Sequence, residues 1–343
     1  MTRTLMEALR AQGMDVQLVD RRFSKSSSEI GRFSLKKLAS ALLLPVRLAW
    51  KLIGYRPQTI IFFATNRTFS FLVDVLLSVV LRATPARKIV YLHTRGFSVL
   101  SDQSKFMASL VRLLLGCADS IVCLGPSLTT DVSALVSCPI FVIPNATEPP
   151  KVIEPRRSEY ILYFSNLIPE KGADVFLDVA RAVREKMPDM RFVVAGATAD
   201  EMYRTRLMEQ ASRDLGDCVR FMGAVSDEST KWQTIAGASL LVFPSTYPFE
   251  AQPLTILEAF SVGTPVAALD VGGIKDIVSH GRTGLLLDAN DVDGMAAAVV
   301  QLLSDPATLA LMSDEARKEF EAVFSREAFA KRWQSLLEAG EIS

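Results

Sequence analysis

The sequence predicts an α/β protein built from two consecutive, doubly wound domains. Short apolar segments alternate with helical segments along the chain, which is typical of parallel sheets whose two faces are covered by helices. The alternation is interrupted at 146–159, where the sequence ATEPPKVIEPRRSE is rich in proline and charge. We interpret this stretch as a linker that joins a first domain over 1–148 to a second domain over 149–343.

The first half opens with a helix over 2–12, which Gly13 ends. The strands predicted from its short apolar runs cover 15–19, 59–63, 88–94, 120–125 and 140–145. The helices predicted between them cover 34–54, 69–81 and 104–116.

The second half repeats the alternation after the linker. Its predicted strands cover 160–166, 191–196, 219–223, 239–245, 265–270 and 284–288. Its predicted helices cover 173–187, 200–214, 227–237 and 253–262, and the chain is helical from Asp291 on. Ligands of doubly wound sheets bind beyond the carboxyl ends of the strands, so a site is expected in the segments that follow strands.

The charges are divided unevenly although the net charge is zero. Residues 1–150 carry 18 Lys and Arg against 9 Asp and Glu, whereas 151–343 carry 20 against 29. A basic half joined to an acidic half indicates two domains with different partners.

Composition favours a cytoplasmic protein. The four cysteines form no CxxC pair, and we interpret them as reduced. With two histidines a zinc site is not expected. The chain begins with a charged amphipathic segment rather than a signal peptide, and the uncharged run 234–249 is too short to span a membrane.

Lys171 and Gly172 stand between a predicted strand and a predicted helix. A lysine beside the free N–H groups of a helix N-terminus suits a phosphate, but a solvated loop lysine explains the same pattern. The turn at Gly272 and Gly273 allows close approach of a ligand, and it is equally compatible with an ordinary tight turn.

Two glutamates flank the start of the predicted helix at Pro253. Glu250 lies just ahead of the helix N-terminus, and Glu258 lies in its second turn. From spacing alone, Glu250 is either a cap-region carboxylate or a ligand-binding group, and Glu258 is either a salt-bridge partner or a ligand-binding group.

Taken in order, these motifs resemble the nucleotide-sugar-binding half of retaining glycosyltransferases of family 4, which have the two-domain GT-B fold. The resemblance extends over 160–290. The residues that carry it are Ser165, Asn166, Leu167, Glu170, Lys171, Gly172, Pro244, Ser245, Glu250, Pro253, Glu258, Ala259, Gly263, Pro265, Val266, Gly272, Gly273, Gly281, Gly284, Leu285 and Leu286.

The resemblance implies roles for these residues. Lys171 would hold the donor diphosphate, and Glu258 would accept hydrogen bonds from the ribose hydroxyls. Glu250 would bind a hydroxyl of the transferred sugar and stabilise positive charge near its anomeric carbon. The remaining donor-binding residues would be Asn166, Gly172, Gln252, Leu254, Thr255, Gly272 and Gly273, with Leu254 and Thr255 acting through their N–H groups.

The donor itself would be a co-substrate, a nucleotide-diphosphate sugar, and no cofactor is implied. No metal would be needed, since a lysine and helix termini carry the charge of the leaving group.

His93 ends a predicted strand in the sequence VYLHTRGFS. In similar proteins a histidine at this place faces the sugar, so we count His93 with Glu250 and Lys171 as catalytic. The alternative is a strand-end histidine with a local hydrogen bond. We expect the other histidine, His280, to lie in a surface turn.

The chain departs from the family pattern in two places. Asn166 stands where the family has an arginine, and it brings no charge to a phosphate. Such proteins also begin with a strand and a Gly-rich loop, whereas this sequence begins at the helix that follows them. We therefore expect an N-terminal domain without that first strand and loop.

The helix predicted over 34–54 is both cationic and apolar. Lys36, Lys37, Arg47 and Lys51 fall within about 100° of one another at 100° per residue, and Trp50 lies near the end. Such a helix suits an anionic membrane surface, but a sheet-covering helix with solvated lysines explains it equally well. A nucleic-acid partner is not expected, because no recognition motif accompanies the basic residues.

These observations together predict a metal-independent, retaining glycosyltransferase of the hexosyltransferase type. Its acceptor would be lipid-linked or a saccharide, in bacterial surface polysaccharide or glycolipid synthesis at the inner membrane face. The alternative is a catalytically impaired, nucleotide-sugar-binding subunit of a polysaccharide assembly system. A sugar-nucleotide epimerase with the same fold explains the two glutamates less simply.

Overall fold

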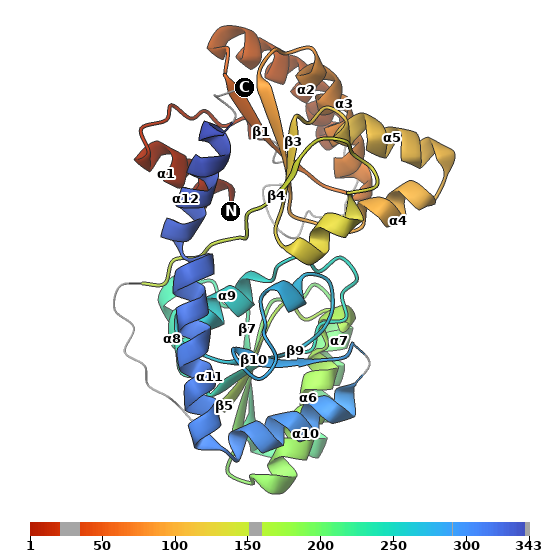
Figure 1. The fold of residues 1–343 in the computed structure, drawn as a ribbon. Coiled ribbons are helices and arrows are strands. Elements are labelled where there is room, and N and C mark those ends of the chain that lie inside the picture. The colour runs from red at the N-terminus through yellow and green to blue at the C-terminus, as the bar shows by residue number, and fades with distance from the viewer. Residues whose placement is uncertain (21–34, 151–159, 290, 340–343) are drawn as a thin grey trace. The chain divides into compact units, whose positions relative to one another are not determined.

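The computed structural model describes residues 1–20, 35–150, 160–289 and 291–339. Its contacts group the chain into two compact units, one made of 14–143 and the other of 1–13 together with 144–343 (Figure 1). The division differs from the predicted boundary at 148, because the first helix packs within the second unit. Residues 151–159 of the predicted linker lie outside the described residues.

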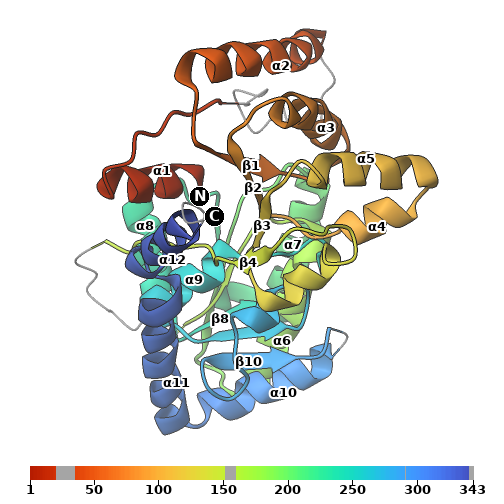
Figure 2. The same cartoon turned by 45° about the horizontal axis from the view of Figure 1, so that its top comes forward.

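The unit over 14–143 contains a four-stranded parallel sheet in the order β1-β2-β3-β4. The strands are β1 (Thr59–Ala64), β2 (Arg87–Leu92), β3 (Ser120–Cys123) and β4 (Ile140–Val142). The helices are α2 (Leu35–Tyr55), α3 (Thr68–Arg82), α4 (Phe97–Asp102) and α5 (Lys105–Leu115). Helix α2 packs beside α3, and α3 beside α5 (Figure 2).

The strand predicted over 15–19 is wrong, because residues 14–20 form no regular element. Carbonyl groups of this segment bond to side chains of α2 instead of to a neighbouring strand. Tyr55 donates its hydroxyl hydrogen to the Asp15 carbonyl at 2.7 Å, and Lys51 Nζ donates to the Leu18 carbonyl at 3.0 Å.

The second unit is organised around a six-stranded parallel sheet in the order β10-β9-β8-β5-β6-β7. Its strands are β5 (Tyr160–Phe164), β6 (Arg191–Ala195), β7 (Val219–Gly223), β8 (Leu240–Phe243), β9 (Val266–Leu269) and β10 (Gly284–Leu287). From β5 the chain moves outward to β6 and β7, then returns to β8 on the other side of β5. The strand order therefore reverses between β5 and β8, as in a doubly wound sheet.

Helices cover this sheet with separate apolar clusters. One cluster includes residues of α6 (Ala173–Lys186), α7 (Glu201–Asp214) and α10 (Val292–Leu303). The other includes residues of α8 (Glu228–Ala236), α9 (Leu254–Ser261), α11 (Pro306–Glu319) and the π-helical turn Phe320–Phe324 that follows it. Side-chain caps begin α7, α8 and α11, where Asp200, Asp227 and Asp305 accept from backbone N–H groups of the first turn.

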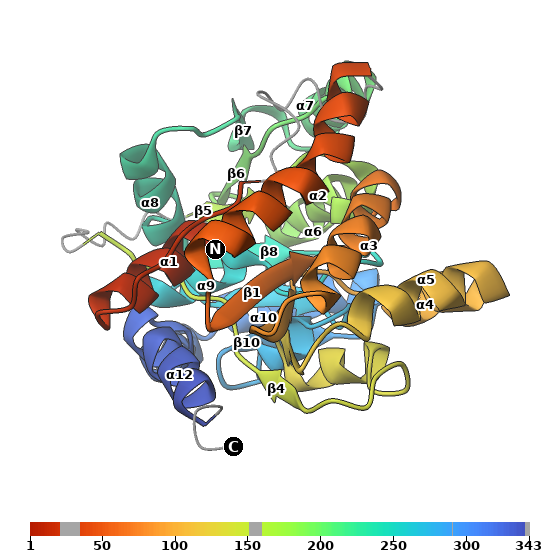
Figure 3. The ribbon, with the colours of Figure 1, turned by 90° about the horizontal axis from the view of Figure 1, so that it is seen from above.

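The first helix, α1 (Thr2–Ala11), lies beside the last, α12 (Arg326–Glu338), in every view (Figure 3). Its residues Leu5, Ala8 and Leu9 are buried. Gln12 Nε2 donates to the Ala330 carbonyl at 2.9 Å.

Over the described ranges, no single helix has the length and apolar character needed to cross a bilayer. The helical stretches 293–303 and 306–324 meet that test only as a pair, with a bend of 102° between them.

Candidate active site

The reversal point of the six-stranded sheet brings two loops together. One follows β5 and carries Lys171, and the other follows β8 and carries Glu250. The two loops are joined through their backbones, since Thr246 N–H donates to the Glu170 carbonyl at 2.9 Å. Gly172 has a φ of +72°, and a Cβ atom there would lie 2.3 Å from the Pro244 carbonyl oxygen. Only glycine fits at this position.

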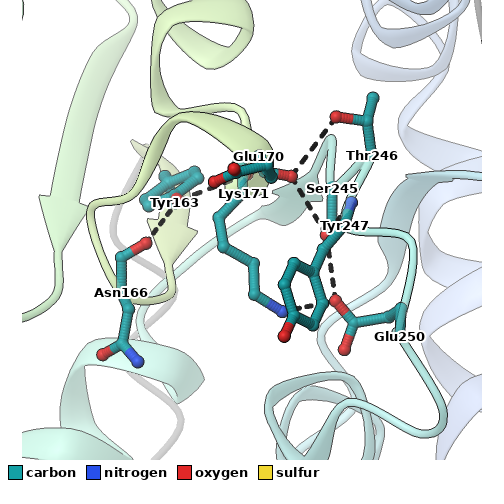
Figure 4. Close-up of polar contacts among 8 residues, drawn as sticks. All are labelled: Tyr163, Asn166, Glu170, Lys171, Ser245, Thr246, Tyr247 and Glu250. Atoms are coloured by element: carbon teal, nitrogen blue, oxygen red, sulfur yellow. Dashed lines mark hydrogen bonds and ion pairs between the residues drawn. The ribbon is translucent and has the colours of Figure 1, made fainter. Parts of the chain in front are cut away.

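Lys171 and Glu250 form an ion pair (Figure 4). The same Glu250 oxygen accepts a hydrogen bond of 2.9 Å from Ser245 Oγ. The Lys171 ammonium also lies 4.7 Å from the centre of the Tyr247 ring, within reach of a cation–π contact. The pair is largely buried, with 15% of the Lys171 side chain and 9% of the Glu250 side chain exposed. The structure thus brings two of the three predicted catalytic residues together.

The Gly272–Gly273 turn supports the Glu250 loop. Gly272 has a φ of +62°, and a Cβ atom there would lie 1.8 Å from the Glu250 carbonyl oxygen. Gly273 N–H donates to the same oxygen at 3.4 Å. A glycine is therefore required at 272 because the Glu250 carbonyl of the protein's own backbone lies against it. A contact of this turn with the donor stays a prediction.

Helix α9 begins directly after Pro253, which provides no side-chain cap. The N–H groups of Leu254 and Thr255 lie in its first turn, where a helix has no internal acceptor for them. Gln252 is buried, and its Oε1 accepts from Asn145 N–H at 2.5 Å. Gln252 is therefore engaged in fixing the loop, and a contact of the two N–H groups with an anion stays a prediction.

Glu258 lies in α9 and forms an ion pair with Lys231 of α8 at 3.1 Å. Lys231 also pairs with the exposed Glu228 at 2.9 Å. Burial raises the pKa of the Glu258 carboxyl group, and Lys231 opposes this in part. Burial works against the charge of Lys231, but its hydrogen bonds to both glutamates outweigh it and raise its pKa. The salt-bridge interpretation of Glu258 is confirmed, and its contact with a ribose stays a prediction.

Asn166 follows β5, at the same end of the sheet as Lys171 and Glu250, and it is exposed. Its carbonyl oxygen accepts from the Tyr163 hydroxyl at 3.2 Å. Its side-chain amide is directed away from the Lys171–Glu250 pair (Figure 4). The structure does not bring this amide to the pair.

His93 belongs to the other unit and follows β2. Its ring stacks on Phe63 with 5.1 Å between centroids and meets Tyr91 at 4.2 Å. Its Nε2 atom is buried and has no hydrogen-bond partner among the described residues. Burial lowers the pKa of His93 to about 3. The alternative prediction, a local hydrogen bond of His93, is therefore not met at Nε2 within the described residues, and the catalytic role stays a prediction.

The loop after His93 is held by a buried carboxylate. Asp131 accepts from the N–H groups of Gly96, Phe97 and Ser98 at 2.8, 2.9 and 3.1 Å. These bonds begin the short helix α4, which the sequence did not predict. The other histidine, His280, is exposed and accepts from Leu286 N–H at 3.1 Å, which confirms the predicted surface turn.

The described parts of the chain hold no group of three or more His, Cys, Asp or Glu side chains arranged to bind a metal ion. Sequence reasoning missed the contributions of Tyr247 and Lys231. Tyr247 lies within the PS…E motif, which was a usable signal. Lys231 had none, because its spacing of three from Glu228 is that of an ordinary surface pair.

Comparison with known proteins identifies the family. The family of glycosyl transferases group 1 matches residues 145–319, about half of the chain. The D-inositol 3-phosphate glycosyltransferase of Thermobispora bispora is 32% identical over 197 residues, which cover 55% of this chain and 45% of that protein. A GDP-mannose-dependent phosphatidylinositol monomannoside mannosyltransferase of Corynebacterium glutamicum is 28% identical over 51% of this chain and 46% of its own. The chain thus spans about half the length of these relatives.

Solved structures agree with the predicted fold. Sucrose-phosphate synthase from Thermosynechococcus elongatus superimposes with a TM-score of 0.77 at 20% identity, over 98% of this chain and 92% of that one. Anabaena HepE in complex with UDP and glucose gives 0.68 at 19% identity, over 86% and 81%. The predicted GT-B fold is confirmed, and the chain belongs to the glycosyl transferases group 1 family.

Proposed function

We propose that the protein is a retaining, metal-independent glycosyltransferase of the hexosyl type. It moves a sugar from a nucleotide-diphosphate donor to an acceptor hydroxyl. The observation that carries the proposal is the meeting of Lys171 and Glu250 at the reversal point of the sheet. Ligands of doubly wound sheets bind at this point, beyond the carboxyl ends of the strands.

When a donor binds, Lys171 and Glu250 contact different parts of it. A diphosphate offers Lys171 a doubly charged partner, and the N–H groups of Leu254 and Thr255 add hydrogen bonds at the start of α9. Glu250 keeps its bond from Ser245 and is then available to accept a hydrogen bond from a sugar hydroxyl. Donor binding therefore exchanges the partner of Lys171 without leaving Glu250 unbonded.

The reaction transfers charge onto the diphosphate. The bond between the anomeric carbon and the phosphate oxygen breaks, and its electron pair stays on the diphosphate. The acceptor oxygen bonds to the same face of the anomeric carbon, and the acceptor proton moves to the departing diphosphate. Lys171 stabilises the charge of the leaving group, while Glu250 stabilises positive charge on the sugar.

Glu258 serves the nucleotide in this proposal. A carboxylate has lone pairs for about four hydrogen bonds, so its contact with Lys231 leaves room for ribose hydroxyls. The position of Glu258 in the second turn of α9 places it one turn from the N–H groups proposed for the phosphate.

The relatives support the proposed acceptor class. Their names include transfer to an inositol phosphate and to a phosphatidylinositol mannoside. We propose a lipid-linked or saccharide acceptor in bacterial surface polysaccharide or glycolipid synthesis, with the enzyme in the cytoplasm at the inner membrane face.

Asn166 favours a second candidate function. Its exposed, uncharged amide stands where the family has an arginine, so the charge available to the diphosphate is smaller. A nucleotide-sugar-binding subunit without transfer activity would tolerate this loss.

Thermal shift measurements with UDP-, GDP- and ADP-sugars test the proposal. One nucleotide sugar should stabilise the protein, the shift should vanish in Glu258→Ala, and it should persist in the surface control Lys186→Ala. Transfer to a glycolipid or saccharide acceptor should follow with the anomeric configuration kept, and it should survive EDTA. Donor binding without transfer favours the second candidate, and no binding by any nucleotide sugar overturns both.

A further inference from the structure

Helix α2 presents an apolar stripe to solvent. Leu44 and Leu48 point into the unit and are buried. On the opposite side, Leu43, Val46, Trp50 and Ile53 are exposed, and 75% of Trp50 and 69% of Ile53 are accessible. Their spacing of three, four and three residues places them on one helical face. The solvent face of an ordinary surface helix is polar, so this stripe requires an explanation.

Helix α3, which packs beside α2, repeats the pattern. Phe69, Leu72, Leu76 and Val79 have the same spacing, and each is between 38% and 52% exposed. Phe71, Leu77 and Leu81 of the same helix are buried. Two adjacent helices therefore each fill their inner side and still leave large apolar side chains outside.

The exposed charges that α2 and α3 themselves carry are of one sign, while the exposed Asp15 lies beside the Tyr55 end of α2. Arg47 and Lys51 are exposed on α2, Arg56 follows it, and Arg82 ends α3. The acidic residue of these helices, Asp74, is fully buried. Side chains of Lys36 and Lys37 lie outside the described residues. Exposed leucine, isoleucine and tryptophan flanked by arginine and lysine match the interfacial region of an anionic bilayer.

We infer that the α2 stripe, supported by the α3 stripe, docks the protein on an anionic lipid surface. Trp50 and Ile53 enter the boundary between head groups and acyl chains, and Arg47 and Lys51 contact lipid phosphates. A second copy of the chain is a poorer occupant, because pairing these faces would bring like charges together. The inference does not depend on the proposed sugar transfer.

Trp50 provides a direct readout. The chain has three tryptophans, and the other two, Trp232 and Trp333, are buried. A blue shift of tryptophan emission on adding vesicles therefore reports Trp50. The full-length protein should bind vesicles of phosphatidylcholine with 30% phosphatidylglycerol at least tenfold more tightly than pure phosphatidylcholine. Brominated acyl chains should quench its emission.

Variants separate the apolar and charged parts of the surface. Trp50→Ser/Ile53→Ser and Leu72→Ser/Leu76→Ser should each weaken vesicle binding at least fivefold. Arg47→Glu/Lys51→Glu should abolish the preference for anionic vesicles. Leu311→Ser, at a position 67% exposed on α11, is the matched control and should bind as the wild type does.

Three results would overturn the inference. Wild-type protein that ignores anionic vesicles excludes the lipid surface. Trp50 emission that is already blue-shifted in buffer shows that protein covers the stripe. A dimer that Trp50→Ser/Ile53→Ser dissociates assigns the surface to a second copy. An unfolding midpoint in buffer equal to that of the wild type checks that each variant is folded.

Discussion

Lys171 and Glu250 are 79 positions apart in the chain, yet their side chains form an ion pair because the strands before them are neighbours. Neither group is placed by its local sequence. The pair depends on β5 and β8 lying side by side, and on the two loops sharing backbone contacts at Glu170, Gly172 and Pro244.

Replacing Lys171 leaves the buried Glu250 carboxylate without its cation. Lys171→Ala should lower the free energy of unfolding by roughly 2–4 kcal/mol, because among the described residues the Glu250 carboxylate then keeps the hydrogen bond from Ser245 but no cation. Donor binding should be lost as well. Urea unfolding measures the first effect and a thermal shift the second.

Lys186→Ala is the control, since that lysine is exposed at the end of α6. The double variant Lys171→Met/Glu250→Gln should recover part of the lost stability, because it buries no unpaired charge. Equal destabilisation by Lys171→Ala and Lys186→Ala would show that the pair contributes nothing.

Gly272→Ala tests the support under Glu250. The added Cβ atom meets the Glu250 carbonyl at 1.8 Å, so the loop must move, and we expect a loss of roughly 2–4 kcal/mol together with donor binding. Gly281→Ala shares the positive φ, +75°, but has no atom within 4 Å. It should cost only about 1 kcal/mol and keep donor binding. Similar behaviour of the two variants would rule out the backbone contact as the reason for the glycine.

Glu258 should give the protein an unusual pH dependence. Burial raises its pKa above the ordinary 4.5, so the folded protein holds this proton more tightly than the unfolded chain does. Its contribution to the free energy of unfolding is therefore present at acidic pH and falls as the pH rises from 4.5 through the folded pKa. Over that interval the wild type should lose stability relative to Glu258→Gln in chemical unfolding.

Glu228→Gln removes the exposed partner of Lys231 and the smallest of the effects that raise the pKa of Glu258, so it should keep a fall of the same sign as the wild type. A wild type that gains stability relative to Glu258→Gln as the pH rises would mean that the attraction of Lys231 exceeds the cost of burial.

His93 should remain neutral throughout the physiological range. Its pKa is lowered to about 3, so its imidazole resonances should not titrate between pH 8 and 5 in an NMR experiment. Since the ordinary pKa is 6.5, the associated stability is present above 6.5 and is lost as the pH falls towards 3. His93→Phe keeps the ring contacts and should reduce this acid sensitivity. Titration of His93 near 6.5 would contradict the prediction.

Most elements of the fold could be predicted because their apolar runs are short and clearly bounded. The strand predicted at 15–19 failed although Val16 and Leu18 alternate with polar residues. A strand needs a neighbour, and here the carbonyls of that segment bond to Tyr55 and Lys51 instead. Local pattern does not carry this information.

The site was predictable in part for the same reason. Lys171 and Glu250 were found because each follows a strand within a recognisable motif. The bond between Lys231 and Glu258 joins residues 27 positions apart on different helices, and no spacing rule relates them. The contact between Gly272 and the Glu250 carbonyl could not be predicted either, because the sequence shows a glycine but not which backbone group lies against it.

The packing of α1 against α12 has a consequence for dissecting this protein. Glu7 and Arg326 form an ion pair, and the side chains of Leu5 and Leu9 are buried within the unit that otherwise begins at Pro144. In connectivity, residues 14–143 are therefore inserted between residues 13 and 144 of the other unit. A fragment cut at the family boundary, 145–319, would lack both helices of this closure. A fragment of this unit that keeps both helices must therefore include residues 1–13 as well as 144–343.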